Sequence, residues 1–327
     1  MVDTVKTIKS SGGDYSSLSA WEAGQQKVIS AGNTEQAECY NFQDTTGIII
    51  DGWTTVATGY IRIYTPSTER HTGTRGTGYR LVVSGAGVDA INNAEEYVRL
   101  EGLELKASGS GASGFDHSGS ISATVSDQRI ESCLVYECAA AGVWMGDGIV
   151  KVSNCIIVGN TGDGITCDFG NTGGTFYLYN NTLCANTAYG INRTNSTVNA
   201  KNNYCGGNTT ADYTGAFNTK TKCASSDTSG TASYQSIAYS TSAGAYFTSV
   251  TAGSQNLHIG LSSALKDVAD DLSGDASYPI TVDIDGTTRS GSWDIGADEY
   301  VSAAVGGPGA SFIRLNNGTR KFGGITA

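Results

Sequence analysis

Short stretches of alternating apolar and polar residues recur in the middle of the chain, and four of them align without gaps. They are QRIESCLVYEC (128–138), VKVSNCIIVGN (150–160), FYLYNNTLCAN (176–186) and VNAKNNYCGGN (198–208), and VRLEGLELKAS (98–108) fits more loosely. Such alternation is typical of a strand with one buried face. Each segment therefore predicts two short strands separated by a small or amide residue.

Equivalent positions of these segments form two apolar columns. The first column is Leu100, Ile130, Val152, Leu178 and Ala200, and the second, five residues later, is Leu105, Val135, Ile157, Leu183 and Cys205. Members of the first column are 30, 22, 26 and 22 residues apart. Such a repeat predicts a solenoid whose stacked coils bury a continuous core, with the extra residues inserted at one corner. The predicted fold is all-β, a single-stranded right-handed parallel β-helix.

Stacking places like residues on top of one another, so polar columns predict ladders. Asn154, Asn180 and Asn202 are expected to form an amide ladder at a corner, and Cys133 and Cys155 to stack inside the core.

The ends of the chain differ from the repeat. The sequence predicts an N-terminal strand and capping helix in residues 1–45, β-helix coils in 46–260, a C-terminal cap in 261–300, and a linker with a basic hairpin in 301–327. The hairpin carries Arg314, Arg320 and Lys321 and no acidic residue, which suggests a device for docking on a partner. The alternative is that it folds back as a cap.

Charge narrows the possible partners. The net charge of −11 argues against binding to nucleic acid or to an anionic membrane. The chain contains no run of 18 apolar residues, so the sequence predicts no membrane-spanning helix. The first residues lack the apolar stretch of a signal peptide, so we expect synthesis in the cytoplasm, with a final location on a virion or particle surface or, alternatively, outside the cell.

Eight cysteines allow disulfides, but the absence of a signal-like start favours buried thiols. No CxxC pair occurs and only three histidines are present, so no zinc site is predicted from cysteine and histidine.

The coils resemble the right-handed parallel β-helix superfamily, which includes pectate and chondroitin lyases, polygalacturonases and phage tailspikes. The segments SGGDYSSLSAWEA and DIDGTTR…WDIGADEY resemble the flanks of β-helix repeat proteins from environmental bacteria and tailed phages. The resemblance covers about residues 4–300 and implies the architecture, not an activity, because this fold hosts many functions. Trimer formation is common among such spikes.

Enzymes of this superfamily work in a groove along one face. Asp163 and Asp168 could meet there near Arg193, as a glycoside hydrolase or polysaccharide lyase requires. Asp116-His117, in a Gly/Ser loop between coils, could supply a base, although such a pair is more often only a loop dipeptide. Trp144, Tyr189 and Tyr204 are expected on the surface, where their rings could stack on sugars.

An acidic cluster lies near the C-terminus. It comprises Asp283, Asp285, Asp294, Asp298 and Glu299. Calcium binding is one interpretation, and the other is a structural role in which Arg289 pairs with an acid and Trp293 covers the end of the core. No cofactor is otherwise predicted.

Together these patterns favour a non-enzymatic structural protein of a virion or particle surface, such as a decoration, fibre or tailspike-like protein, that contacts other particle proteins through its C-terminal tail and contacts host glycans. The alternatives are a polysaccharide lyase or glycoside hydrolase and a bacterial extracellular adhesin.

Overall fold

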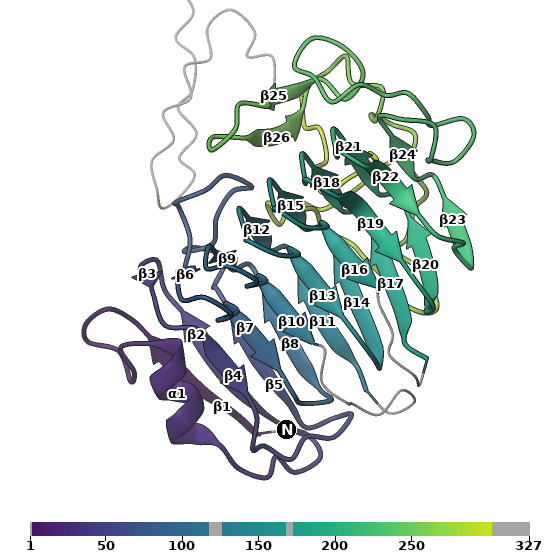
Figure 1. The fold of residues 1–327 in the computed structure, drawn as a ribbon. Helices are drawn as coiled ribbons and strands as arrows, with labels where there is room; N and C mark the ends of the chain where they lie inside the picture. The colour runs from purple at the N-terminus through teal and green to yellow at the C-terminus, as the bar shows by residue number, and fades with distance from the viewer. Residues whose placement is uncertain (1, 118–125, 168–172, 303–327) are drawn as a thin grey trace, which may run out of the picture.

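The computed structural model describes residues 2–117, 126–167 and 173–302. The chain winds as a right-handed parallel β-helix, and each coil contributes one strand to each of three parallel sheets (Figure 1). The repeat thus correctly predicted the fold. Among the described residues, no helix is long and apolar enough to cross a bilayer.

The three sheets are named here in the order in which each coil visits them. Sheet 1 contains, in spatial order, β1 (Val2–Ile8), β2 (Asn33–Cys39), β5 (Tyr60–Tyr64), β8 (Val98–Glu101), β11 (Gln128–Glu131), β14 (Ile149–Ser153), β17 (Thr175–Tyr179), β20 (Thr197–Lys201) and β23 (Thr219–Thr221). Sheet 2 contains β3 (Gln43–Asp44), β6 (Arg80–Val83), β9 (Glu104–Ala107), β12 (Leu134–Tyr136), β15 (Ile156–Val158), β18 (Thr182–Cys184), β21 (Tyr204–Gly206) and β24 (Ala224–Ser225). Sheet 3 contains β4 (Ile48–Ile50), β7 (Ile91–Asn93), β10 (Phe115–His117), β13 (Val143–Met145), β16 (Ile165–Cys167), β19 (Tyr189–Arg193) and β22 (Ala211–Thr214).

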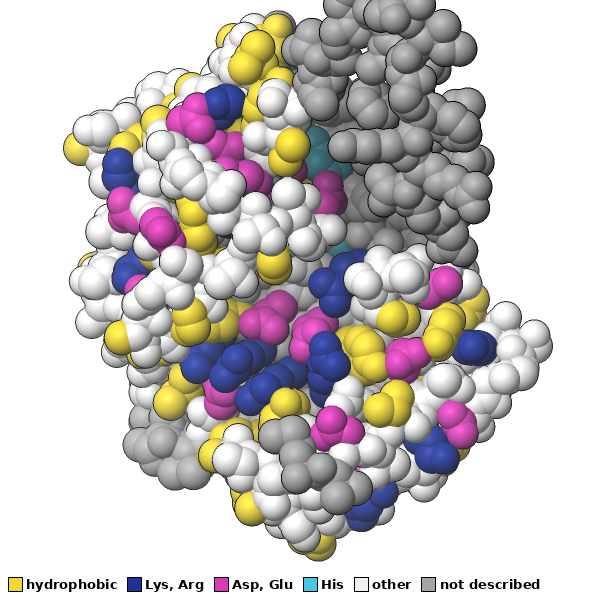
Figure 2. Space-filling view, turned by 180° about the vertical axis from the view of Figure 1, so that it is seen from behind, with side chains coloured by type: hydrophobic (Ala, Val, Ile, Leu, Met, Phe, Trp, Pro, Cys, Tyr) yellow, Lys and Arg dark blue, Asp and Glu magenta, His cyan; other side chains and the backbone are white. Residues whose placement is uncertain are grey.

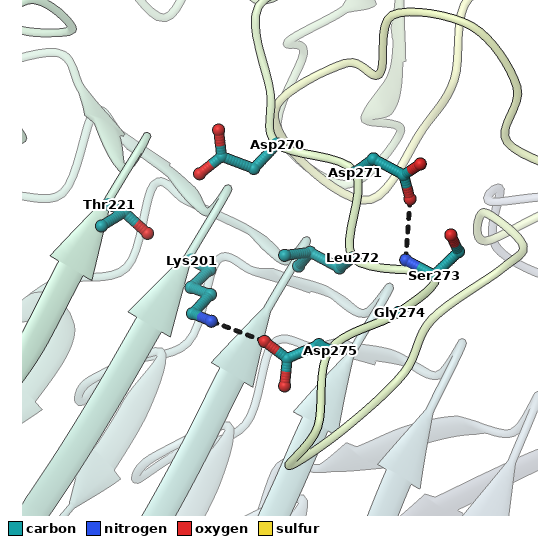
Figure 3. Close-up of a pocket in the computed structure, with 8 residues that line it drawn as sticks. All are labelled: Lys201, Thr221, Asp270, Asp271, Leu272, Ser273, Gly274 and Asp275. Atoms are coloured by element: carbon teal, nitrogen blue, oxygen red, sulfur yellow. Dashed lines mark hydrogen bonds and ion pairs between the residues drawn. The ribbon is translucent and has the colours of Figure 1, made fainter.

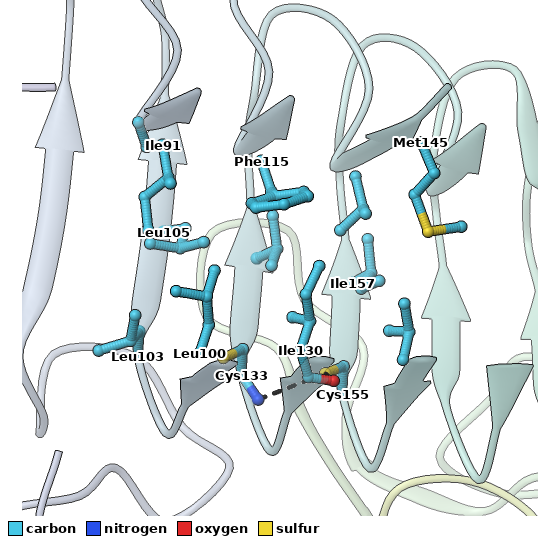
Figure 4. Packing of buried hydrophobic residues seen from close by; sticks show 14 of the residues in the cluster. Ile91, Leu100, Leu103, Leu105, Phe115, Ile130, Cys133, Met145, Cys155 and Ile157 are labelled. Carbon is cyan, nitrogen blue, oxygen red and sulfur yellow. Dashed lines mark hydrogen bonds between the residues drawn. The ribbon is translucent and has the colours of Figure 1, made fainter. Parts of the chain in front are cut away.

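The core is the stack of inward-facing side chains between the sheets (Figure 4). Both predicted apolar columns are confirmed, since Leu100, Ile130 and Val152 pair in register and are at most 1% exposed. Leu105, Val135 and Ile157 do the same in sheet 2. Burying each such aliphatic side chain contributes roughly 1.5–3 kcal/mol, which no single coil could achieve alone.

Two corners of each coil use the same local device. The residue that follows a sheet 1 strand adopts the left-handed backbone conformation. This holds for Ser132, Asn154, Asn180 and Asn202, with φ between 50° and 55°. The residue after the sheet 2 strand is left-handed in Glu137, Gly159, Ala185 and Gly207. Asparagine and glycine tolerate this conformation best, which explains their recurrence at these positions.

The N-terminal helix is α1 (Leu18–Gln25), and it lies within the segment 1–45 for which the sequence predicts a capping helix. Its N-cap is Ser17, whose Oγ accepts a hydrogen bond from Ala20 N at 3.1 Å. The helix buries Leu18 and Trp21 beside β1, β2 and β4 (Figure 1).

After β24 the chain leaves the coil pattern. It forms the antiparallel hairpin β25 (Phe247–Ser249) and β26 (Asn256–Ile259). Residues 262–299, named the strap here, then lie along the corner between sheets 1 and 2: Asp270 N binds Asn202 Oδ1 at 3.0 Å, and Ala297 N binds Thr182 Oγ1 at 2.9 Å. Residues 262–271 form turns.

Candidate functional site

The outer face of sheet 1 carries a column of basic side chains. Arg62, Arg99, Arg129 and Lys151 are direct neighbours on successive strands β5, β8, β11 and β14. Their side chains are between 14% and 29% exposed, so a ligand could reach them. Figure 2 shows a row of Lys and Arg side chains crossing this side of the molecule, with acidic side chains beside it. These four residues are called the basic column below.

Adjacent strands lie roughly 4.8 Å apart, so four stacked cations repel one another unless anions compensate. Glu101 binds Arg62 through two bonds, from Nε at 2.8 Å and from Nη2 at 2.5 Å. Asp127 binds Arg129 Nη2 at 2.6 Å and Lys151 Nζ at 2.8 Å. Burial disfavours the Asp127 anion, but its bonds to Arg129 and Lys151 outweigh that effect and lower the pKa of the carboxyl.

Arg99, near the middle of the column, is the least compensated cation. Its Nε has no hydrogen-bond partner among the described residues, and its nearest carboxylate oxygen, on Asp127, is 3.8 Å away. Burial, together with the neighbouring Arg129, lowers the pKa of Arg99. The guanidinium carbon lies 3.6 Å from the ring centroid of Tyr60, which holds the group in place. Arg99 is therefore the cation of the column that the protein's own carboxylates neutralise least.

The strap forms one side of this face. The Tyr278 hydroxyl lies 2.6 Å from Glu131 Oε1 and 2.7 Å from Ser153 Oγ, at the ends of the strands that carry Arg129 and Lys151. Burial raises the pKa of Glu131. Further along, an open cavity of about 580 Å³ lies between Lys201, Thr221 and the strap residues 270–275, where Lys201 Nζ binds Asp275 Oδ2 at 2.5 Å (Figure 3).

Of the predicted catalytic residues, the structure describes Asp163 and Arg193 but not Asp168. Asp163 lines a cleft of about 350 Å³ on sheet 3, and its carboxylate accepts bonds from Thr166 Oγ1 (2.8 Å), Asn192 Nδ2 (2.9 Å) and Tyr189 N (3.1 Å). Arg193 lies in the next column, in register with buried Cys167, and its Nε donates to Ser196 O at 2.8 Å. Asp168 lies outside the described residues.

The three aromatic candidates for sugar binding differ in their exposure to solvent. Trp144 is partly exposed and lines the sheet 3 cleft, and Tyr189 is also partly exposed. The expectation that Tyr204 lies on the surface is wrong: it is 0% exposed, and its hydroxyl binds Ile237 O at 2.9 Å. The hairpin β25–β26 causes this burial, since the Phe247 ring packs edge-on against Tyr204 at 5.5 Å.

Asp116 and His117 lie in strand β10, not in a loop. His117 is buried with Nδ1 at 2.9 Å from Asn93 O, and burial lowers its pKa. The two side chains thus point to opposite faces of the strand and do not form a joint base.

The predicted amide ladder is only partly present. Asn202 Nδ2 donates to Asn180 Oδ1 at 3.2 Å, but Asn154 Oδ1 accepts from Arg289 Nη2 at 3.3 Å, and Asn180 Nδ2 has no partner among the described residues. Continuous ladders lie one residue beyond the left-handed positions: Asn160 Nδ2 donates to Asn186 Oδ1, and Asn186 Nδ2 to Asn208 Oδ1, both at 2.9 Å.

The prediction that Cys133 and Cys155 stack inside the core is confirmed. Cys133 N lies 3.4 Å from Cys155 Sγ, and all eight cysteines are buried free thiols (Figure 4).

The acidic cluster serves mainly to fold the strap. Arg289 is fully buried and donates to Glu299 Oε2 at 2.9 Å and to the carbonyl oxygens of Gly296 and Ala297. Asp294 accepts the N–H groups of Asp267 and Tyr300. The structural interpretation of Arg289 is therefore confirmed. The docking residues Arg314, Arg320 and Lys321 lie outside the described residues.

Sequence analysis missed the basic column, although the alignment contains it. Arg99, Arg129 and Lys151 each precede a member of the first core column, so they share one outward position. A positive charge recurs at this outward position in consecutive coils, which is unexpected in an acidic protein and could have revealed the column.

Comparison with known proteins adds little on function. No protein-family profile and no curated protein matches the sequence. Among solved structures, the chain is similar to one titled "Crystal structure of pectate lyase Pel9A", with a TM-score of 0.47, 14% sequence identity, and coverage of 91% of this chain and 97% of the other. The fold is the parallel β-helix that the strand order itself establishes.

Proposed function

We propose that this β-helix binds an acidic polysaccharide along the outer face of sheet 1. The observation that carries the proposal is the basic column, four cations in register on adjacent strands of a protein whose net charge is −11. A linear polymer lying along the stack would meet one basic side chain in each coil. A polymer with a repeating acidic unit could therefore make the same kind of contact in successive coils.

The chemistry favours carboxylated sugars over neutral ones. Guanidinium groups present paired N–H donors that match the two oxygens of a carboxylate. Tyr60 and Tyr64, on the same face, lie under Arg99 and Arg62 and hold the two guanidinium groups flat. Glu101 and Asp127 hold the remaining cations in place, so the face is ordered before a ligand arrives.

The test compares polygalacturonate with dextran, a neutral glucan, in affinity gel electrophoresis. We expect retardation by polygalacturonate alone, weakening as salt is raised, because exposed charges are screened. Arg99→Gln should weaken binding about tenfold, equivalent to about 1.4 kcal/mol. Arg80→Gln, which removes a cation from sheet 2, is the matched control and should bind like the wild type.

Equal retardation by both glycans, or loss of binding in Arg80→Gln but not in Arg99→Gln, would contradict the proposal. The same mixtures are then assayed for unsaturated and reducing sugar ends. Their appearance would favour the alternative of a polysaccharide lyase or glycoside hydrolase on the same face.

Roles as a virion or particle protein, as an adhesin or as a homotrimer remain predictions of the sequence. For docking through the tail, a variant with Arg314, Arg320 and Lys321 changed to Gln is the direct test, with loss of incorporation into particles as the expected result.

A further inference from the structure

Three metal-binding side chains from separate parts of the chain meet beside the hairpin β25–β26. They are His258 on β26, Asp285 in the turn that follows Asp283, and Asp298 near the end of the strap. One ligand atom of each lies within 4.8 Å of the other two, and His258 Nε2 is 3.1 Å from Asp285 Oδ2.

The imidazole of His258 is oriented for coordination through Nε2. Its Nδ1 lies 2.5 Å from Asn256 Oδ1, an oxygen that only accepts, so Nδ1 carries hydrogen. A hydrogen bond from the other ring nitrogen is the usual way in which proteins orient a metal-binding histidine. Nε2, directed at Asp285, is the atom left for a metal.

Asp298 supplies an independent indication of a cation-binding site. It is 6% exposed, and one carboxylate oxygen accepts the Ile259 N–H at 2.8 Å. Among the described residues, no Lys or Arg forms an ion pair with it, and its remaining oxygen accepts no hydrogen bond. Buried carboxylates are normally paired or bound to metal, and the second oxygen of Asp298 is available for a metal.

The neighbouring acids are already used by the backbone. Asp283 Oδ1 accepts the N–H groups of Asp285 and Thr287, and its Oδ2 accepts the Glu299 N–H. The Asp294 carboxylate accepts the N–H groups of Asp267 and Tyr300, and Glu299 accepts the Asp294 N–H and pairs with Arg289. The donor set is therefore one nitrogen and two carboxylates. Calcium prefers six to eight oxygens, whereas zinc binds through nitrogen and oxygen with four ligands.

The backbone of an early coil closes the cluster. At Gly73, between β5 and β6, a Cβ atom would lie 2.9 Å from His258 Nε2 and 3.5 Å from Asp285 Oδ1. A side chain at this position would occupy the space beside the three donors. The cluster thus lies where the strap, the hairpin and the loop before β6 come together.

We propose that His258, Asp285 and Asp298 bind one divalent transition-metal ion, represented by Zn²⁺, which fastens the strap to the hairpin beside Gly73. Water would complete the coordination. The ion has a structural role here, and the proposal is independent of glycan binding on sheet 1.

The test uses the full chain after removal of metals with EDTA, titrated with ZnCl₂ and, separately, with CaCl₂ by calorimetry. We expect one Zn²⁺ per chain, a raised Tm, and at least tenfold weaker binding of Ca²⁺. His258→Gln and Asp298→Asn should each weaken Zn²⁺ binding at least tenfold. Asp267→Asn, which changes an exposed carboxylate of the strap, is the matched control and should bind like the wild type.

Cobalt separates this site from the buried thiols. Co²⁺ bound at nitrogen and oxygen gives d–d absorption without a thiolate charge-transfer band, and that is the expected spectrum. No stoichiometric Zn²⁺ binding, a thiolate band, tighter Ca²⁺ than Zn²⁺, or unchanged affinity in both variants would overturn the proposal. Asn at 298 still accepts the Ile259 N–H, and far-ultraviolet circular dichroism checks that each variant folds. If one does not, the other carries the test.

Discussion

At the scale of single residues, each coil turns by a left-handed residue followed by an inward-pointing one. Asn180 and Asn181 show the pattern: Asn180 has a φ of 54°, and Asn181 Nδ2 donates to Asn203 Oδ1 at 3.0 Å inside the core. The first residue permits the turn, and the second satisfies the backbone of the preceding coil, since Asn181 Oδ1 accepts the Cys155 N–H at 3.0 Å. The two roles can be separated by substitution.

Ser132 occupies a left-handed position where the preceding coil has Gly102. The left-handed conformation costs roughly 1–2 kcal/mol for a residue with a Cβ, whereas Gly loses part of that gain through unfolded-state entropy. We expect Ser132→Gly to stabilise the protein by about 0.5–1 kcal/mol and Ser132→Val to destabilise it, in urea unfolding. A Gly variant less stable than the wild type would show that the serine hydroxyl matters more than the backbone.

Asn186 belongs to the inward ladder and is 0% exposed. Its Oδ1 accepts both the backbone N–H and Nδ2 of Asn160, and its Nδ2 donates to Asn208. Asn186→Ala would leave these buried groups unpaired, so we expect a loss of about 2–4 kcal/mol in the free energy of unfolding. Asn195→Ala, at an exposed position, serves as the control and should change it by less than about 0.5 kcal/mol.

At the scale of elements, charge is distributed by strand face. Sheet 1 carries the basic column, whereas the turns after β4 and β7 bring acids together. Glu95, just after β7, is 5% exposed, and its Oε1 accepts the Trp53 N–H at 2.8 Å. Burial, with Glu96, Asp51 and Glu22 nearby, raises the pKa of Glu95 to about 7.

The raised pKa of Glu95 determines the direction in which the stability of the protein changes with pH. Because the folded-state pKa of Glu95 exceeds its unfolded value, the native state holds more protons, and stability falls as pH rises from about 4.5 to about 7. Glu95→Gln keeps an acceptor for Trp53. It should therefore be more stable than the wild type by about 1–2 kcal/mol at pH 8, with little difference at pH 4.

Urea unfolding at both pH values measures the effect. Asn195→Ala changes no titratable group, so its stability relative to the wild type should be the same at both pH values. A constant difference between Glu95→Gln and wild type at both pH values would contradict the assignment.

At the scale of the whole molecule, the sequence predicted the coils far better than the surfaces. The columns of Leu100 and Leu105 repeat because stacking requires it, so one alignment fixed fold and register. The burial of Tyr204 depends on a hairpin more than 40 residues away in the chain, a distance that no repeat encodes. Arg193 was misplaced because adjacent strand residues face opposite ways, and Asn192, not Arg193, points at Asp163.

The strap depends on Arg289, whose side chain is fully buried. Arg289→Met would leave Glu299 and several carbonyl oxygens unpaired, a local cost of about 3–5 kcal/mol. We expect hydrogen exchange, read by mass spectrometry, to accelerate in residues 262–299 while β8 to β20 stay protected, since solenoid coils are stabilised by their neighbours. Arg80→Met is the control. Uniform acceleration along the chain would mean that strap and coils unfold as one unit.

Because all coils share one register, the sheet 1 face could become longer or shorter without a change in the side chains that line it. Leu100, Ile130 and Val152 are interchangeable as core neighbours, so a chain lacking residues 129–150 would still pair Leu100 with Val152 and would set Lys151 beside Arg99. Each whole coil gained or lost changes the face by one strand spacing, roughly 4.8 Å. Duplication or deletion of one coil in the gene could therefore adjust how long a polymer the protein accommodates, while the contacts between the remaining coils keep their geometry.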